Sequence, residues 1–195
     1  MWYLTFEQET GLHEWLLRCR GLLADESALN PVPERWLHCT VDDVAFLDEL
    51  SEGRLAALAE AGAGQLRGWS APTLDLGPVV PMDDALVLEV HPLAALDDLR
   101  DRVRRATLGV LGPQALPALE PFEPHVTVAY ANRRCDAGPL LRRLAPIRDD
   151  RLVTGPARLG LAAVTRRPAH YEWQTRHVVP REQPEPAYLP LRRPR

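Results

Sequence analysis

The chain has 195 residues, of which 46% are hydrophobic and 26% charged, as in an ordinary soluble globular protein. This length is enough for one sizeable domain or for two small lobes in close contact. The formal net charge of −4 argues against broad, sequence-independent adhesion to nucleic-acid backbones, although it does not exclude a local basic cleft.

The cysteines also limit what the chain can be. Cys19, Cys39 and Cys135 are odd in number, widely spaced and without a CxxC pair, so we expect no disulfide framework. No run approaches the roughly 18 apolar residues of a transmembrane helix. The first residues show no basic start followed by an apolar run, which a secretory signal would need. We therefore expect a cytoplasmic protein without a membrane partner.

The first half of the chain alternates between strand and helix patterns. Aromatic and β-branched residues predict a strand over 2–6, and leucines at helical spacing predict a helix over 11–23 with Thr10 as its cap. Residues 30–33 read as a turn or loop, and 36–41 as a second strand. A second helical pattern covers 43–65, with Gly53 as a point where it can break.

The second half continues in the same way. Strands are expected over 68–81 and 85–90, joined by a turn at Met82-Asp83-Asp84, and the continuous apolar run of the second strand predicts burial on both faces. The pattern predicts helices over 93–111 and 138–144, a Pro-rich crossing loop over 112–124, and a strand over 125–130. Two more strands, 157–165 and 171–179, are joined by a loop around Pro168. Residues 181–195 form a Pro- and Arg-rich tail that we expect to be poorly ordered. Periodicity alone therefore indicates a mixed α+β protein.

Two similar tetrapeptides stand out, one in each half of the chain. They are HCTV, beginning at His38, and HVTV, beginning at His125, and both follow a proline-containing segment. Residues two apart on a strand point to the same face, so each motif presents an imidazole beside a hydroxyl, from Thr40 and Thr127. Cys39 should point to the opposite face, where a small buried residue is the expected role.

This combination suits chemistry at phosphorus. Breaking a phosphodiester requires one group that activates the attacking oxygen and one that protonates the departing oxygen, and imidazole can do either near neutral pH. Hydroxyl donors can stabilise the charge that grows on the non-bridging oxygens. The scheme requires no metal ion and no cofactor. The alternative is that each histidine is a hydrogen-bonded structural residue and each threonine simply a good strand former.

On these two motifs and the strand-helix pattern between them, the chain resembles the 2H phosphoesterases, which include the enzymes called 2′-5′ RNA ligases and cyclic phosphodiesterases. The resemblance covers about residues 1–180. It implies one bilobal α+β domain in which two antiparallel sheets face each other across a central groove, with helices on the outside. It also implies that each sheet offers one His-x-Thr strand to the groove.

The resemblance implies a function as well. We expect a metal-independent phosphoesterase that opens or forms 2′,3′-cyclic phosphates or 2′-5′ phosphodiesters at an RNA end or in a small nucleotide. His38 and His125 would be the acid–base pair, with Thr40 and Thr127 as phosphate donors; which histidine is the base stays open. The chain contains no lysine, which excludes a ligase that works through a covalent lysyl-nucleotide.

Three further residues are candidate substrate contacts. Tyr171 lies where the resembling family often places an aromatic residue along the groove, although a core position is equally compatible. Many family members carry an Arg shortly after the second motif, but Ala129 and Tyr130 stand there in this chain. Tyr130 is therefore a candidate contact, and Arg166 is a candidate replacement for the missing cation, against the default of a solvated surface arginine.

Two other interpretations remain open. One is a non-catalytic nucleotide- or RNA-binding module on the same scaffold, which would keep both histidines and turn over nothing. The other is an unrelated α+β protein in which His38 and His125 lie far apart. For the phosphoesterase we expect a monomer. The position of the two imidazoles distinguishes the unrelated α+β protein from the other interpretations.

Overall fold

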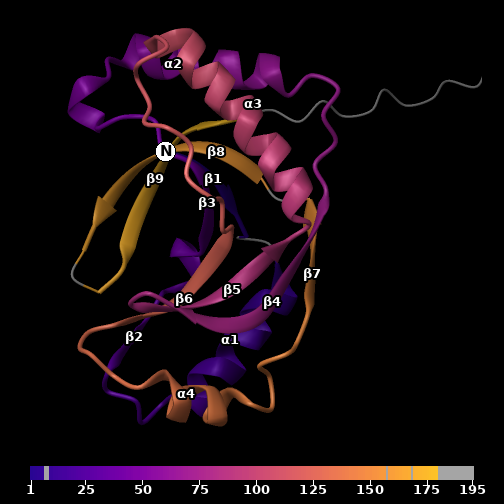
Figure 1. Ribbon diagram of the computed structural model, residues 1–195, viewed down its shortest axis with the longest axis vertical. Coiled ribbons are helices and arrows are strands. Elements are labelled where there is room, and N and C mark those ends of the chain that lie inside the picture. The colour runs from indigo at the N-terminus through magenta and orange to yellow at the C-terminus, as the bar shows by residue number, and fades with distance from the viewer. Residues whose placement is uncertain (7–8, 157, 168, 180–195) are drawn as a thin grey trace, which may run out of the picture.

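The computed structural model describes residues 1–6, 9–156, 158–167 and 169–179. Within these ranges, nine strands form two antiparallel sheets (Figure 1). The four-stranded sheet has the order β3-β1-β8-β9, with β3 (His38–Asp42), β1 (Trp2–Thr5), β8 (Arg158–Arg166) and β9 (Tyr171–Val178). The five-stranded sheet has the order β2-β6-β5-β4-β7, with β2 (Leu29–Pro31), β6 (His125–Ala131), β5 (Ala85–His91), β4 (Thr73–Met82) and β7 (Leu152–Pro156).

The helices lie outside the two sheets (Figure 1). The helices α2 (Glu52–Gln65) and α3 (Leu93–Leu111) pack against each other at one end of the molecule, on the four-stranded sheet. There, the indole of Trp2 on β1 donates a hydrogen bond of 2.9 Å to the hydroxyl of Thr107 on α3. The helices α1 (Thr10–Leu22) and α4 (Ala137–Leu144) lie at the other end, beside the five-stranded sheet. The expected α+β class, with two antiparallel sheets and outer helices, is confirmed.

The two motif strands come from different sheets and touch each other. Strand β3 is at the edge of its sheet, whereas β6 lies between β5 and β2, and β3 and β6 are in contact across the interface of the two sheets. Cys39 is fully buried at this contact. Burial raises the pKa of its thiol to about 12, although a hydrogen bond from the His125 backbone opposes that rise. Cys39 is thus a core residue on the far face of the motif strand, as expected.

Several element boundaries differ from the sequence expectation. The helix expected over 43–65 starts only at Glu52, because Ser51 caps it: its hydroxyl accepts a hydrogen bond of 3.3 Å from the Arg54 backbone. Before the cap there is only the short 3-10 helix η2 (Leu47–Glu49). The strand expected from residue 68 starts at Thr73, because Gly68 has a φ of 70° and the chain turns there.

Short strands account for the other differences. Residues 30–33 were expected to be a turn or loop, but Leu29–Pro31 form the strand β2. This strand pairs with β6, and Pro31 lies opposite Ala129. Strand β7 was not expected at all and pairs with β4. Trp36 belongs to the 3-10 helix η1 (Glu34–Trp36), so the first motif strand begins at His38 itself. The expected helix 93–111 and the turn after Met82 are found as predicted, whereas the tail 181–195 lies outside the described residues.

The length and polarity of the helices bear on membrane insertion. None of the helices in the described ranges is long and apolar enough to span a bilayer.

Candidate active site

His38 and His125 line one cleft of about 500 Å³ between the two sheets. Thr40 and Thr127 line it too, so both pairs face the same space. Along each motif strand, the histidine and threonine are partly exposed, whereas the residues between and after them are buried. This alternation is the one that a strand dictates, and it places four polar groups on the cleft side. The interpretation in which the two imidazoles lie far apart is therefore wrong.

Both imidazoles are held by the same local contact. The Nδ1 atom of His38 lies 2.8 Å from the carbonyl oxygen of Trp36, and that of His125 lies 2.7 Å from the carbonyl oxygen of Glu123. A carbonyl oxygen only accepts, so Nδ1 carries the proton and donates in each ring. The Nε2 atom of each neutral ring is then left as an acceptor for a proton from a ligand.

The environment of His38 favours its neutral form. Burial lowers the pKa of His38, the hydrogen bond to the Trp36 carbonyl opposes this change, and the nearby charge of His125 lowers the pKa further. The ring of Tyr3 contacts His38 edge-on, with 6.3 Å between centroids. Tyr3 itself packs with Trp173 and Ala162 in a small buried cluster, so the wall behind His38 is aromatic.

The candidate substrate contacts meet at one side of the cleft. Tyr130 on β6 and Tyr171 on β9 line it, and their rings lie 5.8 Å apart, which joins the two sheets. Burial raises the pKa of Tyr130, more than the hydrogen bond from Thr127 lowers it. Arg166 does not line the cleft: its guanidinium carbon lies 5.7 Å from the centre of the Tyr171 ring. It acts on the site through its contact with the Tyr171 ring and through its positive charge, which lowers the pKa of Tyr130.

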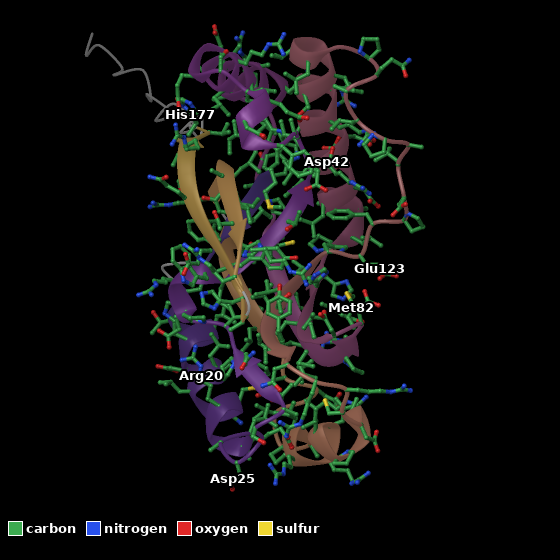
Figure 2. The ribbon with its side chains drawn as sticks, turned by 90° about the vertical axis from the view of Figure 1, so that its left-hand side faces the viewer. Arg20, Asp25, Asp42, Met82, Glu123 and His177 are labelled. Carbon is green, nitrogen blue, oxygen red and sulfur yellow. The ribbon has the colours of Figure 1, made fainter. Side chains whose placement is uncertain are left out.

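A set of ionic contacts behind the site was not foreseen from the sequence. Asp42, the residue after the first motif, is buried and labelled in Figure 2. It lies 3.3 Å from Arg104 and 3.5 Å from Arg100, both on α3. Burial raises the pKa of Asp42, and the two arginines oppose this. Arg100 also donates to the carbonyl oxygen of Glu120 at 2.9 Å, and Arg104 donates to that of Pro117. The same two side chains thus hold the end of β3 and the loop that leads to His125.

The cleft also contains carboxylates that the sequence pattern did not assign to it. Asp43 follows β3, while Asp83 and Asp84 form the turn between β4 and β5, and all three are exposed residues that line the cleft. The other lining residues are apolar or sulfur-containing side chains, namely Met1, Met82, Ala85, Val87 and Val164.

The remaining histidines of the described chain lie outside this cleft. His91 and His170 each lie 3.6 Å from a glutamate, Glu89 and Glu172 respectively. Across the four described ranges of the chain, no group of three or more His, Cys, Asp or Glu side chains is arranged to hold a metal ion.

Residues 11–170 match the model of a protein family described as the 2′-5′ RNA ligase superfamily. The chain belongs to this superfamily. No functionally curated protein matches the chain significantly. Among solved structures, TT0787 of Thermus thermophilus is similar with a TM-score of 0.65 and 17% identity, over 91% of this chain and 95% of that one. E. coli LigT complexed with 3′-AMP is similar with a TM-score of 0.64 and 16% identity, over 91% and 94% of the two chains. A structure described as a phosphoesterase is similar with a TM-score of 0.60 and 16% identity, over 91% of this chain and 94% of that one.

At these identities the solved structures show a shared fold, and family membership indicates the coarse activity. This superfamily member is a phosphoesterase-type enzyme with its two His-x-Thr motifs in one cleft. The roles of the individual side chains follow from the chemistry of that cleft.

Proposed function

We propose that this protein opens or forms a 2′,3′-cyclic phosphate or a 2′-5′ phosphodiester in a small nucleotide or at an RNA end. The observation that carries the proposal is the matched geometry of the two imidazoles. Each anchors Nδ1 on the carbonyl oxygen two residues before it, and both rings line one cleft. The nucleotide in the structure of E. coli LigT, which shares the fold, supports a nucleotide as the ligand.

In the hydrolytic direction, His38 is the general base. Its lowered pKa keeps the ring neutral near physiological pH, so Nε2 can take a proton from the attacking water. The water oxygen forms a bond to phosphorus, and the bond from phosphorus to one ribose oxygen breaks. His125, in its protonated form, gives a proton from Nε2 to that departing oxygen. In the ligating direction the two roles exchange.

The neighbouring side chains hold the phosphate and the nucleoside. The hydroxyls of Thr40 and Thr127 donate to the non-bridging oxygens, where negative charge increases in the transition state. Tyr130 and Tyr171 offer ring surface for a base on the side where the two sheets meet. Arg166, stacked on Tyr171, contributes a positive charge beside the phosphate.

Hydrolysis of nucleoside 2′,3′-cyclic phosphates in the presence of EDTA tests this proposal. The wild-type protein should form nucleoside monophosphate under these conditions, since the scheme uses side chains only. His38→Ala and His125→Ala should each lower kcat by about 10³-fold, the middle of the range for loss of a general acid or base.

His177→Ala is the matched control for these variants. It makes the same substitution on β9 outside the cleft, far from Met82 in Figure 2, and should leave kcat unchanged. Circular dichroism should show that all three variants keep the fold. Full activity in either cleft variant would refute the paired role, whereas tight binding of a cyclic phosphate without turnover in the wild type would identify a non-catalytic binding module.

A further inference from the structure

The candidate active site has an unusual charge for a protein that handles phosphates. Three carboxylates, those of Asp43, Asp83 and Asp84, line the cleft, and no arginine does so among the described residues. The chain has 23 basic residues, all arginine, so the absence does not reflect a lack of cations. Among the lining side chains of the described cleft, only the two histidines can carry a positive charge. Met1 also lines the cleft, but its α-amino group donates to the carbonyl oxygen of Ala162 at 2.9 Å, and burial lowers the pKa of this group.

Apart from Arg166, the arginines around the site have other partners or line another cleft. Arg100 and Arg104 are engaged with Asp42 behind the motif strand. Arg133 and Arg134 line a separate cleft of about 400 Å³, and Arg133 donates a hydrogen bond of 2.7 Å to the hydroxyl of Ser27. Asp83, Asp84 and Ala85 line both clefts, so the acidic turn lies between the histidines and these two arginines.

The acidic turn is held in place by the backbone. Asp83 has a φ of 48°, in the left-handed region that Asp tolerates, and the turn joins the paired residues Met82 and Ala85. The carbonyl oxygen of Asp84 accepts a hydrogen bond of 2.7 Å from the backbone of Ala131, which continues β6. The backbone of the turn therefore keeps both aspartates on the cleft wall.

We propose that this cleft selects substrates with a single phosphate, such as a nucleoside 2′,3′-cyclic phosphate, and rejects RNA strands with further phosphates. The proposal rests on the proposed function, because it concerns the substrate class of the same site. One phosphate is balanced by the protonated histidine, the threonine hydroxyls and Arg166. Each additional phosphate of an RNA strand brings a further negative charge toward the three carboxylates, and no lining arginine of the described cleft can pair with it.

The expected size of the discrimination follows from elementary electrostatics. A phosphate and a carboxylate separated by ~10 Å of water repel each other enough to lower affinity by about twofold. Three carboxylates together therefore disfavour an additional phosphate by roughly tenfold at low salt. The effect should weaken as ionic strength rises, because the Debye length falls from about 30 Å at 0.01 M to about 10 Å at 0.1 M.

Competition between two substrates with the same terminal nucleoside tests the proposal. One is cytidine 2′,3′-cyclic phosphate, and the other is a tetraribonucleotide that ends in the same cyclic phosphate. At 0.01 M salt, kcat/KM for the mononucleotide should exceed that for the tetranucleotide by roughly tenfold, and the ratio should fall toward about two as salt is added. In Asp83→Asn/Asp84→Asn, the tetranucleotide should gain more than the mononucleotide, so the ratio should shrink at low salt.

A double variant on α3 provides the matched control. Asp97→Asn/Asp101→Asn removes the same two charges from exposed positions outside the cleft, and it should leave the substrate ratio as in the wild type. The proposal would be overturned if the wild-type protein preferred the tetranucleotide at low salt and the Arg134→Ala variant did not. The second cleft would then be the binding site for the rest of the RNA. A wild-type protein that turns over neither substrate would instead contradict the proposed function itself.

Discussion

The two motif strands, β3 and β6, present the same pattern from different positions. Both anchor the imidazole on the carbonyl oxygen two residues earlier. Strand β6 is paired on both sides, by β5 and β2, whereas β3 is an edge strand with β1 as its one neighbour in the described sheet. The edge strand compensates with contacts from outside its sheet. Its last residue, Asp42, meets two arginines of α3. Within the sheet, its histidine lies against Tyr3 of β1.

This difference indicates how the two halves are kept in register. The arginines that bind Asp42 also bind carbonyl oxygens in the loop before His125. Helix α3 therefore fixes the end of one motif strand and the approach to the other with the same side chains. A disturbance of this helix should move both imidazoles, whereas a disturbance within one sheet should affect one motif more than the other.

Removing both imidazoles gives the sharpest test of whether the two strands form one site. Each single alanine variant is expected to lose about 10³-fold in kcat. The His38→Ala/His125→Ala double variant should lose at most about tenfold more than either one, because groups that act on one phosphorus atom lose their effect together. Single-turnover rates with a cyclic phosphate measure this. Losses that multiply fully would indicate two independent sites.

Breaking the contact between β3 and α3 should have the next largest effect. Asp42→Ala leaves two largely buried guanidinium groups without their carboxylate, so we expect the free energy of unfolding to fall by about 3 kcal/mol. Urea denaturation measures this change. Asp43→Ala, at the next and exposed position, is the control and should stay within about 0.5 kcal/mol of the wild type. Equal losses in the two variants would contradict the role of the ionic contacts.

The contrast between the strands also explains what the sequence could reveal. Alternation along HCTV and HVTV depends only on neighbouring residues, so the cleft-facing histidines and threonines could be predicted. The pairing of Asp42 with Arg100 and Arg104 depends on the chain returning after a long separation, and no local pattern encodes it. The sequence also predicted the turn that contains Asp83. The position of this turn beside the imidazoles, however, follows only from the tertiary arrangement.

The missed elements have similar causes. Strands β2 and β7 are short edge strands that take their conformation from β6 and β4, so their own residues give little alternation. The late start of α2 was signalled by Ser51, a good helix cap, but the apolar residues before it concealed this signal. Arg166 was one candidate for the missing cation, against the default of a surface arginine, and its guanidinium carbon lies 5.7 Å from the centre of the Tyr171 ring.

A smaller effect on stability is expected from crowding between α2 and the four-stranded sheet. A Cβ atom at Gly62 on α2 would come within 2.6 Å of the Trp2 ring, which is fully buried and held by its hydrogen bond to Thr107. Gly62→Ala should therefore lower the free energy of unfolding by about 2 kcal/mol. Gly64→Ala on the same helix meets nothing within 4 Å and should instead stabilise the protein by roughly 0.5–1 kcal/mol. Thermal or urea unfolding of the pair measures the difference, and a gain in both variants would show that Trp2 can move aside.

The smallest expected effect is a shift in the pH at which His38 titrates. Burial is the main cause of its lowered pKa, so its ring should titrate below the ordinary value of about 6.5, as followed by NMR of the imidazole protons. Because the base must be neutral, the acid limb of kcat/KM should also lie below that pH, with activity lost as the pH falls through it. His125→Ala removes a charge that lowers the same pKa, so the titration midpoint of His38 should rise in that variant, whereas His177→Ala should leave it in place. A midpoint above about 6.5 in the wild type would reverse the assignment of base and acid, and an unchanged midpoint in His125→Ala would mean that the two imidazoles do not sense each other across the cleft.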